Sequence, residues 1–505
     1  MSDTRTNTDV VIAGAGPTGL MLACELRLAG VDVVIVDRLP ERTGESRAGG
    51  LHARTMEVLD QRGGLDRFMR AGTQRPIGHF SGLWLDFDGL ESTYPRSLAL
   101  MQSAVERLLE EWAEDLGTHV RWSSEVTGIR QDASGIDIET SGPRAAGPPL
   151  RARYLVGCDG GRSTVRKLAG IGFPGTPATL TALLGDVELA DPPAEPLFMQ
   201  RRAGGDFSVF AWEPGWYRVI TTEHDRVAGK GEPVTFEGLR ESLLRIAGTD
   251  FGMHSPRWVS GFGDAARQAD RYRNGRVLLA GDAAHIHFPA GGQGLNLGVQ
   301  DAVNLGWKLA SVIRGRTPET LLDSYHSERH PVAARVLHNT RAQSALTRPG
   351  PQTDALRDVL GSLIAYDDVN RHLGGMITAL DVRYPAADGH PLAGRRVPDV
   401  ELKTGDGLTR VFELLRTARP VLLDLCGSPR LAAAFAGWAD RVDLVEARSA
   451  VERWPVWPAD ESPAPAALLV RPDGHVAWAS DAGATLDTAA LRTALTTWFG
   501  PAAAG

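Results

Sequence analysis

The sequence predicts an α/β protein with a Rossmann-like sheet near its N-terminus, a mainly antiparallel sheet inserted into it, and a further domain at the C-terminal end. The first part rests on an apolar run followed by a glycine-rich turn at 9–19, and on later buried runs that end in Gly and Asp. A Pro- and Gly-rich stretch at 383–398 indicates a linker before the last domain. A chain of 505 residues is too long for a single core, so two or three domains are expected.

The first βαβ unit carries the clearest motif. Residues 9–14 and 31–37 are apolar runs typical of buried parallel strands, and a helical pattern between them ends at Gly30. The motif itself is GxGxxG, written Gly14-Ala15-Gly16-Pro17-Thr18-Gly19. Its first glycine permits the tight turn, its second lets a pyrophosphate approach the backbone, and its third lets helix and strand pack closely. Asp37 follows the last glycine by 18 residues, where an acid that binds ribose is expected. The unit therefore predicts a tightly bound nucleotide at the helix N-terminus.

A second GxGxxG, at 170–175, is predicted to be a loop. It follows a helix-like stretch, contains Pro174 and opens no helix. The chain therefore has one credible dinucleotide site.

The remaining patterns set out the other elements. Buried strands are expected at 151–160 and 275–284, and long helices at 101–116 and 294–314. Aromatic-rich alternating runs at 76–98 and 176–262 predict the inserted antiparallel sheet. Beyond the linker, strands are expected at 421–425, 442–447 and 467–479, the last with a Pro-Asp-Gly hairpin turn, and a helix at 488–499.

Composition excludes several classes of protein. Hydrophobic residues make up 43% of the chain and charged residues 23%, as in ordinary globular enzymes, and a net charge of −8 argues against a nucleic-acid partner. The three cysteines form no CxxC pair, which argues against a zinc ribbon or a disulfide framework and suits a cytoplasmic protein. No apolar run reaches the ~18 residues of a membrane span. Residues 1–9 lack the positive region of a signal peptide.

The segment GDAAHIHFPAGGQGLN, residues 281–296, allows two interpretations. Asp282, His285 and His287 are types that bind metals, whereas Pro289 and the glycines suit a loop that holds an organic cofactor. No further metal-ligand motif is visible in the sequence, so the cofactor interpretation is preferred.

Three motifs together resemble a known family. CDGGRSTVR (158–166) places Asp159 after one strand, and GDAAH places Asp282 after another. GxGxxG, DG and GD motifs in this order resemble the class A flavin-dependent aromatic hydroxylases, over most of residues 8–385. More narrowly, ERTGESRAGGLHARTMEVLDQRG, HIHFPAGGQG and DSYHSERHPVA are similar to bacterial hydroxylases of aromatic polyketides, especially the angucycline type.

The resemblance implies a domain layout. Residues 1–75, 99–175 and 263–385 would form a discontinuous FAD-binding domain, and residues 76–98 with 176–262 a substrate-binding β-sheet domain. Residues 390–505 would form a thioredoxin-like domain. Because the redox CxxC of that domain is missing and Cys426 stands alone, we expect it to be structural or interfacial.

The resemblance also implies roles for individual residues. Asp37 would bind the adenosine ribose, Arg47 and Gln102 the diphosphate and ribityl regions, and Asp282 the ribityl or pyrophosphate part. Asp159 would serve both FAD and NADPH, which binds only transiently since no second Rossmann domain is present. The expected cofactor contacts are Gly14, Gly16, Pro17, Thr18, Gly19, Asp37, Arg38, Arg47, Gln102, Val126, Asp159, Asp282, Gly291, Gly292, Gly294, Leu295 and Asn296.

The implied chemistry is hydroxylation of a polycyclic aromatic polyketide through a flavin C4a-hydroperoxide, with NAD(P)H and O2. The N-terminus of the helix from Leu295 would favour the negative charge of reduced flavin, and Pro289 would stiffen the turn beside the oxygen-transfer site. Arg371, in NRHLGGM, resembles a position near the substrate, so Pro289 and Arg371 are the expected catalytic positions. An apolar slot for the substrate is expected from Trp84, Phe87, Phe210, Trp212, Trp216 and Tyr217.

Several alternatives stay open at this stage. A Baeyer–Villiger monooxygenase on a related polyketide would share the scaffold, and no single residue separates it from a hydroxylase. A flavin halogenase would show GWxWxIP, which GWYRVI (215–220) does not match. A non-catalytic flavin-binding protein is the alternative of a different class. The expected partners are a small polycyclic aromatic substrate and O2, with no nucleic acid or membrane; a homodimer is compatible with the resemblance.

Overall fold

The computed structural model describes residues 7–142, 149–224, 226–227, 232–386, 389–458, 460–483 and 485–503. Residues 1–6 and 504–505, at the outer limits of the expected first and last domains, lie outside the described residues. So do 387–388 of the expected linker and short segments within 99–175, 176–262 and 390–505.

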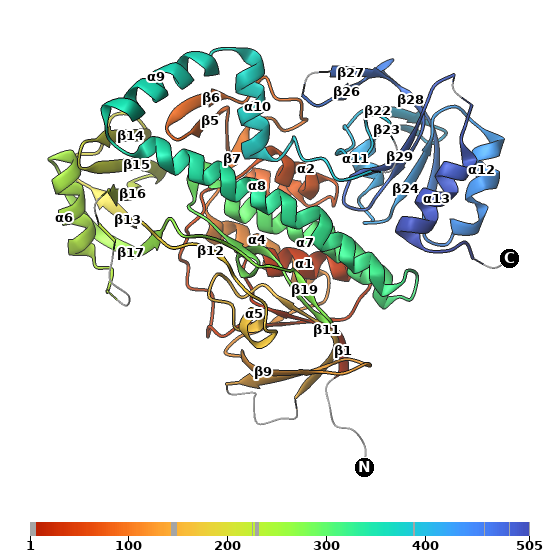
Figure 1. The fold of residues 1–505 in the computed structure, drawn as a ribbon, viewed down its shortest axis with the longest axis horizontal. Helices are drawn as coiled ribbons and strands as arrows, with labels where there is room; N and C mark the ends of the chain where they lie inside the picture. The colour runs from red at the N-terminus through yellow and green to blue at the C-terminus, as the bar shows by residue number, and fades with distance from the viewer. Residues whose placement is uncertain are drawn as a thin grey trace.

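A parallel sheet forms the lower centre of the molecule (Figure 1). Its parallel strands run in the order β20 (Val277–Leu279), β11 (Leu150–Gly157), β1 (Asn7–Ala13), β2 (Val33–Val36) and β8 (Val120–Arg121). Antiparallel additions are β19 (Arg273–Asn274) on β20, and β10 (Ile136–Ser141) between β11 and β9 (Glu125–Gln131). The strands predicted at 9–14, 31–37 and 151–160 are thereby confirmed, whereas only Val277–Leu279 of the predicted 275–284 forms a parallel strand and Gly281–Ala283 form a 3-10 turn.

Three helices pack together on this sheet. They are α1 (Pro17–Leu28), α4 (Gln102–Asp115) and α7 (Gln293–Ile313), with α1 between the other two. The sequence QGLNLGVQDAVNLGWKLASVI of α7 contains only two charged residues, and most of the helix is buried. The helices predicted at 101–116 and 294–314 are confirmed to within one residue at each end. The predicted loop at 170–175 is also confirmed, since α5 (Thr164–Leu168) ends before it and no helix follows it.

The inserted antiparallel sheet has five strands. Their order is β14 (Leu197–Arg202), β15 (Gly205–Glu213), β16 (Trp216–Glu223), β13 (Thr181–Leu189) and β17 (Met253–Gly263). Helix α6 (Phe236–Ala247) covers the outer face, where a separate apolar cluster includes Phe207, Val219 and Leu243. The inner face points toward the parallel-sheet domain, as the contacts described below establish.

The expectation that 76–98 joins this sheet is wrong. Strands β5 (Ile77–Phe80) and β6 (Leu83–Asp86) form a separate hairpin, and β7 (Ser97–Ala99) pairs with β3 (Gly50–Leu51) and β4 (Thr73–Arg75). The physical reason is packing, because Leu85 and Phe87 are buried in a cluster with residues of 346–380 rather than with the five-stranded sheet. Asn370 also bonds the backbone of Asp86 through both its amide atoms.

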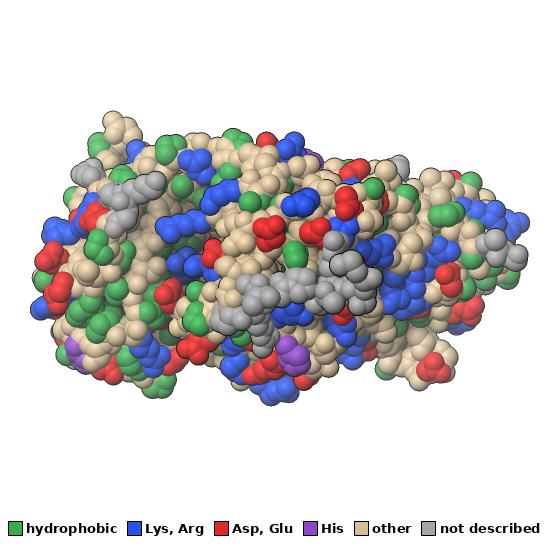
Figure 2. Space-filling view, turned by 90° about the horizontal axis from the view of Figure 1, so that it is seen from below, with side chains coloured by type: hydrophobic (Ala, Val, Ile, Leu, Met, Phe, Trp, Pro, Cys, Tyr) green, Lys and Arg blue, Asp and Glu red, His purple; other side chains and the backbone are tan. Residues whose placement is uncertain are grey.

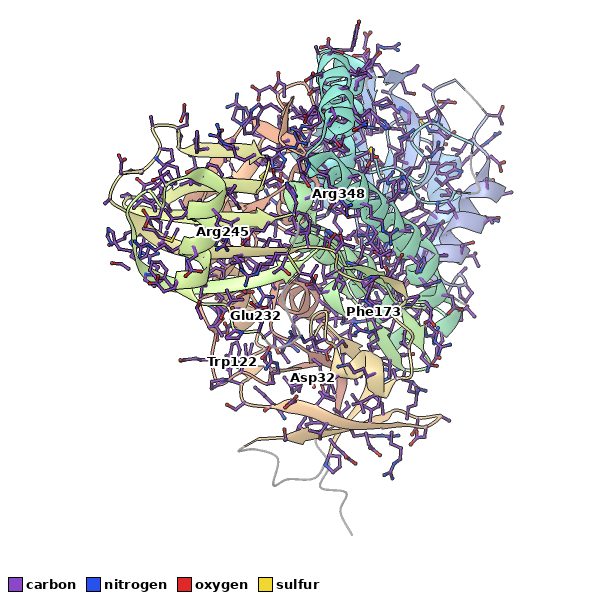
Figure 3. All side chains as sticks on the ribbon, turned by 60° about the vertical axis from the view of Figure 1, so that its left-hand side comes forward. Asp32, Trp122, Phe173, Glu232, Arg245 and Arg348 are labelled. Carbon is purple, nitrogen blue, oxygen red and sulfur yellow. The ribbon has the colours of Figure 1, made fainter. Side chains whose placement is uncertain are left out.

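Three helices follow, one running diagonally across the middle of the molecule and two lying at its top (Figure 1). They are α8 (Asp323–Thr347), α9 (Pro351–Ile364) and α10 (Asp367–Thr378). In Figure 3, Arg245 marks α6 and Arg348 marks the end of α8, with strands of the five-stranded sheet between them. Smaller elements are α2 (Ala53–Asp60), α3 (Leu65–Ala71), β12 (Gly175–Thr176), β18 (Ala266–Gln268) and β21 (His285–Ile286).

The C-terminal region has its own mixed sheet, drawn in blue in Figure 1. Its order is β23 (Gly407–Arg410), β22 (Glu401–Thr404), β25 (Asp443–Ser449), β24 (Val421–Asp424), β28 (Pro465–Val470) and β29 (Val476–Asp481). Of its strand pairs only β24 and β25 run parallel. Helices α11 (Val411–Leu414), α12 (Pro429–Phe435) and α13 (Thr488–Phe499) accompany it, with a hairpin of β26 (Arg453–Val456) and β27 (Asp460–Pro463).

The surface carries charges of both signs. Acidic and basic side chains are interspersed over the face seen from below (Figure 2). Among the described residues, no helix is both long enough and apolar enough to cross a bilayer.

Candidate active site

The glycine-rich turn has the shape needed to hold a pyrophosphate. Gly14 has a φ of +108°, and a Cβ there would lie 2.3 Å from the carbonyl oxygen of Cys158. A Cβ at Gly19 would lie 2.0 Å from the Gly14 oxygen, so both positions need glycine for packing. A Cβ at Gly16 would instead meet no atom within 4 Å. The turn is therefore closed at Gly14 and Gly19 and open at Gly16, and the residues present fit a bound dinucleotide.

Asp37 lies at the mouth of this turn. Its Oδ2 accepts a hydrogen bond from the Ala15 N–H at 2.8 Å, and its Oδ1 accepts one from Leu39 at 2.9 Å. Arg38 is exposed beside it. The N–H of Ser124 donates to the Asp37 carbonyl, which brings the start of β9, with the buried Val126, alongside. The predicted ribose-binding acid and Val126 thus lie at the same edge as the glycine turn.

Thr18 brings the GD motif against the GxGxxG helix, which begins at Pro17. Cβ atoms at Gly281 and Gly298 would lie 2.5 and 2.2 Å from Thr18 Oγ1, so α1, the GD turn and α7 meet at this side chain. Asp282 is exposed beside it, and within the described part of the chain its carboxylate has no hydrogen-bond partner. An acceptor held open next to the pyrophosphate turn fits a hydroxyl group of the cofactor.

Asp159 of the DG motif is engaged within the protein. Its carboxylate accepts hydrogen bonds from Ser163 Oγ at 2.5 Å, Thr164 N at 2.7 Å and Val165 N at 3.0 Å. It therefore satisfies the first N–H groups of α5. A direct role toward FAD or NADPH stays a prediction.

The loop around Arg47 is attached at two points. The amide of Ala48 donates to Gln102 Oε1 at 3.1 Å, so Gln102 holds the loop against the start of α4. The Arg47 carbonyl accepts from Arg218 Nη1 at 3.4 Å, and Asp186 holds Arg218 through two hydrogen bonds of 2.9 Å. The Arg47 side chain is exposed. Gln102 thus supports the loop, and contact of either side chain with FAD stays a prediction.

The segment 287–296 leads into the free N-terminus of α7. Gly291 and Gly292 have φ values of +70° and +66°, which favour glycine. Pro289 is exposed ahead of them, and Gly292 provides no side-chain cap, so the first N–H groups of α7 are available to an anion. The nearest side-chain atom to a Cβ at Gly294, a nitrogen of His287, lies 3.8 Å away, which leaves the backbone accessible.

Asn296 joins α7 to the loop before α2 through its side-chain amide, and its contact with FAD stays a prediction. Its Oδ1 accepts from the His52 N–H at 2.8 Å, and its Nδ2 donates to the Gly50 carbonyl at 3.2 Å. Leu295 packs partly buried against the main core. Burial lowers the pKa of His52 to about 4, so its ring is neutral at pH 7. Asn296 therefore fixes the Arg47–His52 loop to α7.

His285 and His287, the two histidines of the segment 281–296, both form hydrogen bonds within the protein. His285 Nε2 lies 2.6 Å from Asp301 Oδ2, and Asp301 Oδ1 accepts from Arg329 Nε at 2.7 Å. Burial acts to raise the pKa of Asp301, but Arg329 and His285 outweigh it and hold that pKa below its usual value. His287 Nδ1 lies 2.7 Å from the Phe288 carbonyl. The described residues contain no group of three side chains placed to hold a metal ion.

The inner face of the five-stranded sheet lies over these loops. The rings of Phe262 and Phe288 are 5.6 Å apart, and a Cβ at Gly49 would lie 2.3 Å from the Trp212 ring. Strand alternation places Ser208 and Phe210 on the same face. The space between this face and the loops at 47–52 and 287–292 is therefore where a flat aromatic substrate would bind.

Four of the six predicted slot aromatics lie elsewhere. Tyr217 packs in the cluster under α6, Phe87 is buried below α10, Trp84 is 47% exposed, and Trp216 is covered by Arg257 at 3.6 Å. Sequence reasoning missed Phe262 and Phe288, because their contact joins a strand of this sheet to the loop before Pro289 and only the fold brings them together.

No contact joins the Arg371 side chain to the loop at 287–292 among the described residues. It forms an ion pair with Asp368 of its own helix at 2.5 Å. The other end of α10 approaches the loop, since Ile377 Cγ1 would lie 3.6 Å from a Cβ at Gly291. A substrate contact of Arg371 stays a prediction.

The fold and the site together define a flavoprotein of the Rossmann type. Residues 7–340 match the sequence model described as FAD binding domain, and residues 390–502 match that of the aromatic-ring hydroxylase C-terminal region. The chain belongs to the FAD-dependent aromatic-ring hydroxylases and is an FAD-dependent monooxygenase.

Two curated relatives and one solved structure match over nearly the whole chain. A 12-dehydrotetracycline 5-monooxygenase/anhydrotetracycline 6-monooxygenase of Streptomyces rimosus is 48% identical, over 98% of this chain and 99% of the relative. A rifampicin monooxygenase of Streptomyces venezuelae is 47% identical, over 98% and 100%. The solved structure of the anhydrotetracycline hydroxylase OxyS from Streptomyces rimosus has a TM-score of 0.91 at 47% identity, over 99% and 100%.

Proposed function

We propose that this enzyme hydroxylates a polycyclic aromatic polyketide, a flat phenol of the angucycline, anthracycline or tetracycline kind, with NADPH as reductant and O2 as co-substrate. The observation that carries the proposal is the inner face of the five-stranded sheet, which lies directly over the two loops of the FAD site through the contacts of Trp212 and Phe262. Relatives named for tetracycline and rifampicin oxygenation support a large multi-ring substrate.

Reduced FAD, when bound, supplies the activation of O2 and the transfer of one oxygen atom. The chain's own residues provide the surroundings. The free N–H groups at the start of α7 stabilise negative charge beside Gly292. The exposed Asp282 carboxylate accepts a hydrogen bond from a hydroxyl group of the cofactor. Phe210, Phe262 and Phe288 provide apolar walls that orient a flat ring system and exclude water.

The domain layout is part of the same proposal. The FAD-binding domain comprises 1–75, 99–175 and 263–385, and the substrate domain centres on 176–262. The order β22-β25-β24-β28-β29, with β24 and β25 parallel, supports a thioredoxin-like domain at 390–505. Cys426 lacks a second cysteine near α12, so this domain serves structure and not redox chemistry.

The test is oxygen incorporation. We expect purified protein to be yellow, to oxidise NADPH in the presence of O2 and a polycyclic phenol, and to yield a product with one ¹⁸O atom from ¹⁸O2. Mass spectrometry and NMR of the product distinguish a new phenol from a lactone. A lactone would mean that the enzyme catalyses Baeyer–Villiger insertion instead of hydroxylation. Protein that binds FAD but never oxidises NADPH with any such phenol would contradict the proposal.

A further inference from the structure

Asp206 is a carboxylate on the substrate-facing side of the sheet that forms a long ion pair with His224 but has a buried oxygen without a hydrogen-bond donor. It stands on β15 in the alternating row that contains Ser208, Phe210 and Trp212. Its side chain is 24% exposed, and its Oδ1 is fully buried with no hydrogen-bond partner. The nearest basic atom, His224 Nε2, is 3.8 Å from that oxygen, which is too far for a hydrogen bond.

The arginines around Asp206 are engaged elsewhere. Arg201 of β14 donates to Asp354 Oδ1 at 2.5 Å and to the Thr347 carbonyl at 2.8 Å. Arg357 of α9 donates to the carbonyls of Ser81 at 2.7 Å and Leu346 at 3.0 Å.

Burial raises the pKa of Asp206 to about 7, although Arg201 and Arg357 attract its charge. A buried polar group left unsatisfied costs free energy unless a ligand or a water molecule supplies the missing partner.

The register of the sheet places Asp206 far from the flavin loops. Asp206 pairs with Thr222, Thr222 with Ala182, and Ala182 with Phe262. Four neighbouring strands spaced by ~4.8 Å separate the two ends of this row by about 14 Å. The Phe262 end touches Phe288, the residue before Pro289. The separation is comparable with the length of a tetracyclic substrate.

We propose that Asp206 is a specificity-determining residue that accepts a hydrogen bond from a hydroxyl group on the end of the substrate that lies away from the flavin. The inference rests on the proposed function, because it assumes that the polycyclic substrate lies along the inner face. A bound hydroxyl gives the buried oxygen the donor that the protein itself does not provide. Substrates with an apolar far end are thereby disfavoured, since they leave the buried carboxylate oxygen without a hydrogen-bond donor.

The test compares two ligands in two proteins. The ligands are a dihydroxyanthraquinone with a hydroxyl group at each end, and its dimethyl ether. Calorimetric titration of the FAD-loaded protein gives a Kd for each. We expect Asp206→Leu to weaken binding of the diol by about 10- to 100-fold, as for a lost hydrogen bond to a charged group. Binding of the ether is expected to change by less than about threefold, since it makes no such bond.

The melting temperature of the Asp206→Leu variant distinguishes a ligand-binding role of Asp206 from a structural role. Because Asp206→Leu removes a carboxylate whose buried oxygen has no hydrogen-bond donor, we expect its melting temperature to equal or exceed that of the wild type. The raised pKa means that the folded state holds this proton more tightly than the unfolded state, so Asp206 destabilises the fold increasingly as the pH rises from the ordinary pKa of an aspartate to about 7. The gain in the variant is therefore larger at pH 8 than at pH 5. The groups that face Asp206 are His224, Arg201 and Arg357, which stay unchanged in the variant.

Glu213→Gln is the matched control. It removes a carboxylate from the same strand, but one that pairs with Arg257 at an exposed edge. The control is expected to bind both ligands as the wild type does. If Asp206→Leu keeps the wild-type preference for the diol, or melts well below the wild type, the inference fails while the oxygenation activity stands. If no polycyclic phenol stimulates NADPH oxidation by the wild type, the proposed function fails and the inference with it.

Discussion

Arg471→Ala is expected to destabilise the protein by about 3–5 kcal/mol, the usual effect of breaking a buried ion pair. Arg471 is 2% exposed and lies at the turn between β28 and β29, inserted against α7 and α8. It donates to Glu328 through two bonds of 2.5 and 2.8 Å and to Asp473 Oδ1 at 3.1 Å. Lys308 Nζ adds a bond of 2.6 Å to Glu328. Two buried cations thus balance two buried carboxylates, and loss of Arg471 leaves one carboxylate unbalanced.

The measurement is a thermal melt of the FAD-loaded protein, followed by the release of flavin fluorescence. Arg453→Ala is the control, because Arg453 pairs with Glu461 in the same region while both side chains are more than half exposed. An exposed pair of this kind contributes at most about 1 kcal/mol. Equal melting temperatures for the two variants would show that the inserted turn does not hold the domains together. Partial recovery in Arg471→Met/Glu328→Gln is expected, since that pair of changes removes both charges.

The parts of the structure that the sequence predicted are those determined by neighbouring residues. The turn at 14–19 depends on one strand, one helix and the conformations between them, so the spacing of its glycines and Asp37 indicated the geometry that Gly14, Gly16 and Gly19 display. The strands and helices around it followed from apolar periodicity, which is strong in buried elements.

Contacts between distant segments could not be predicted in this way. The hairpin at 77–86 has the alternation of a strand pair, but alternation does not say which sheet or helix will cover it. Glu328 and Arg471 are 143 residues apart, and only the fold brings them together. One signal was available, because Asp301 and Lys308 are the only charged residues in a long helix with many apolar positions, and buried charged residues need partners.

Gly16→Val is expected to leave the fold intact and to weaken FAD binding by on the order of 100-fold, the upper end of a steric penalty of ~1–3 kcal/mol. Gly16 has φ −76° and ψ 179°, an extended conformation that any residue adopts, and no protein atom lies within 4 Å of an added Cβ. The new side chain therefore starts in open space, on the side where the pyrophosphate of the cofactor is expected. The stability of the apoprotein is expected to stay within about 0.5 kcal/mol of the wild type.

Gly19→Ala is the contrasting variant. Its Cβ would lie 2.0 Å from the Gly14 carbonyl oxygen, so it is expected to destabilise the apoprotein itself by about 1–3 kcal/mol. Urea unfolding of both apoproteins, together with a fluorescence titration of each with FAD, separates the two effects. Wild-type FAD affinity in Gly16→Val would mean that the pyrophosphate does not approach the backbone at this turn. Gly14 and Gly19, on either side of Gly16 in the motif, are needed for the packing of the protein itself. A substitution that weakens FAD binding without destabilising the protein is therefore expected at Gly16 and not at Gly14 or Gly19.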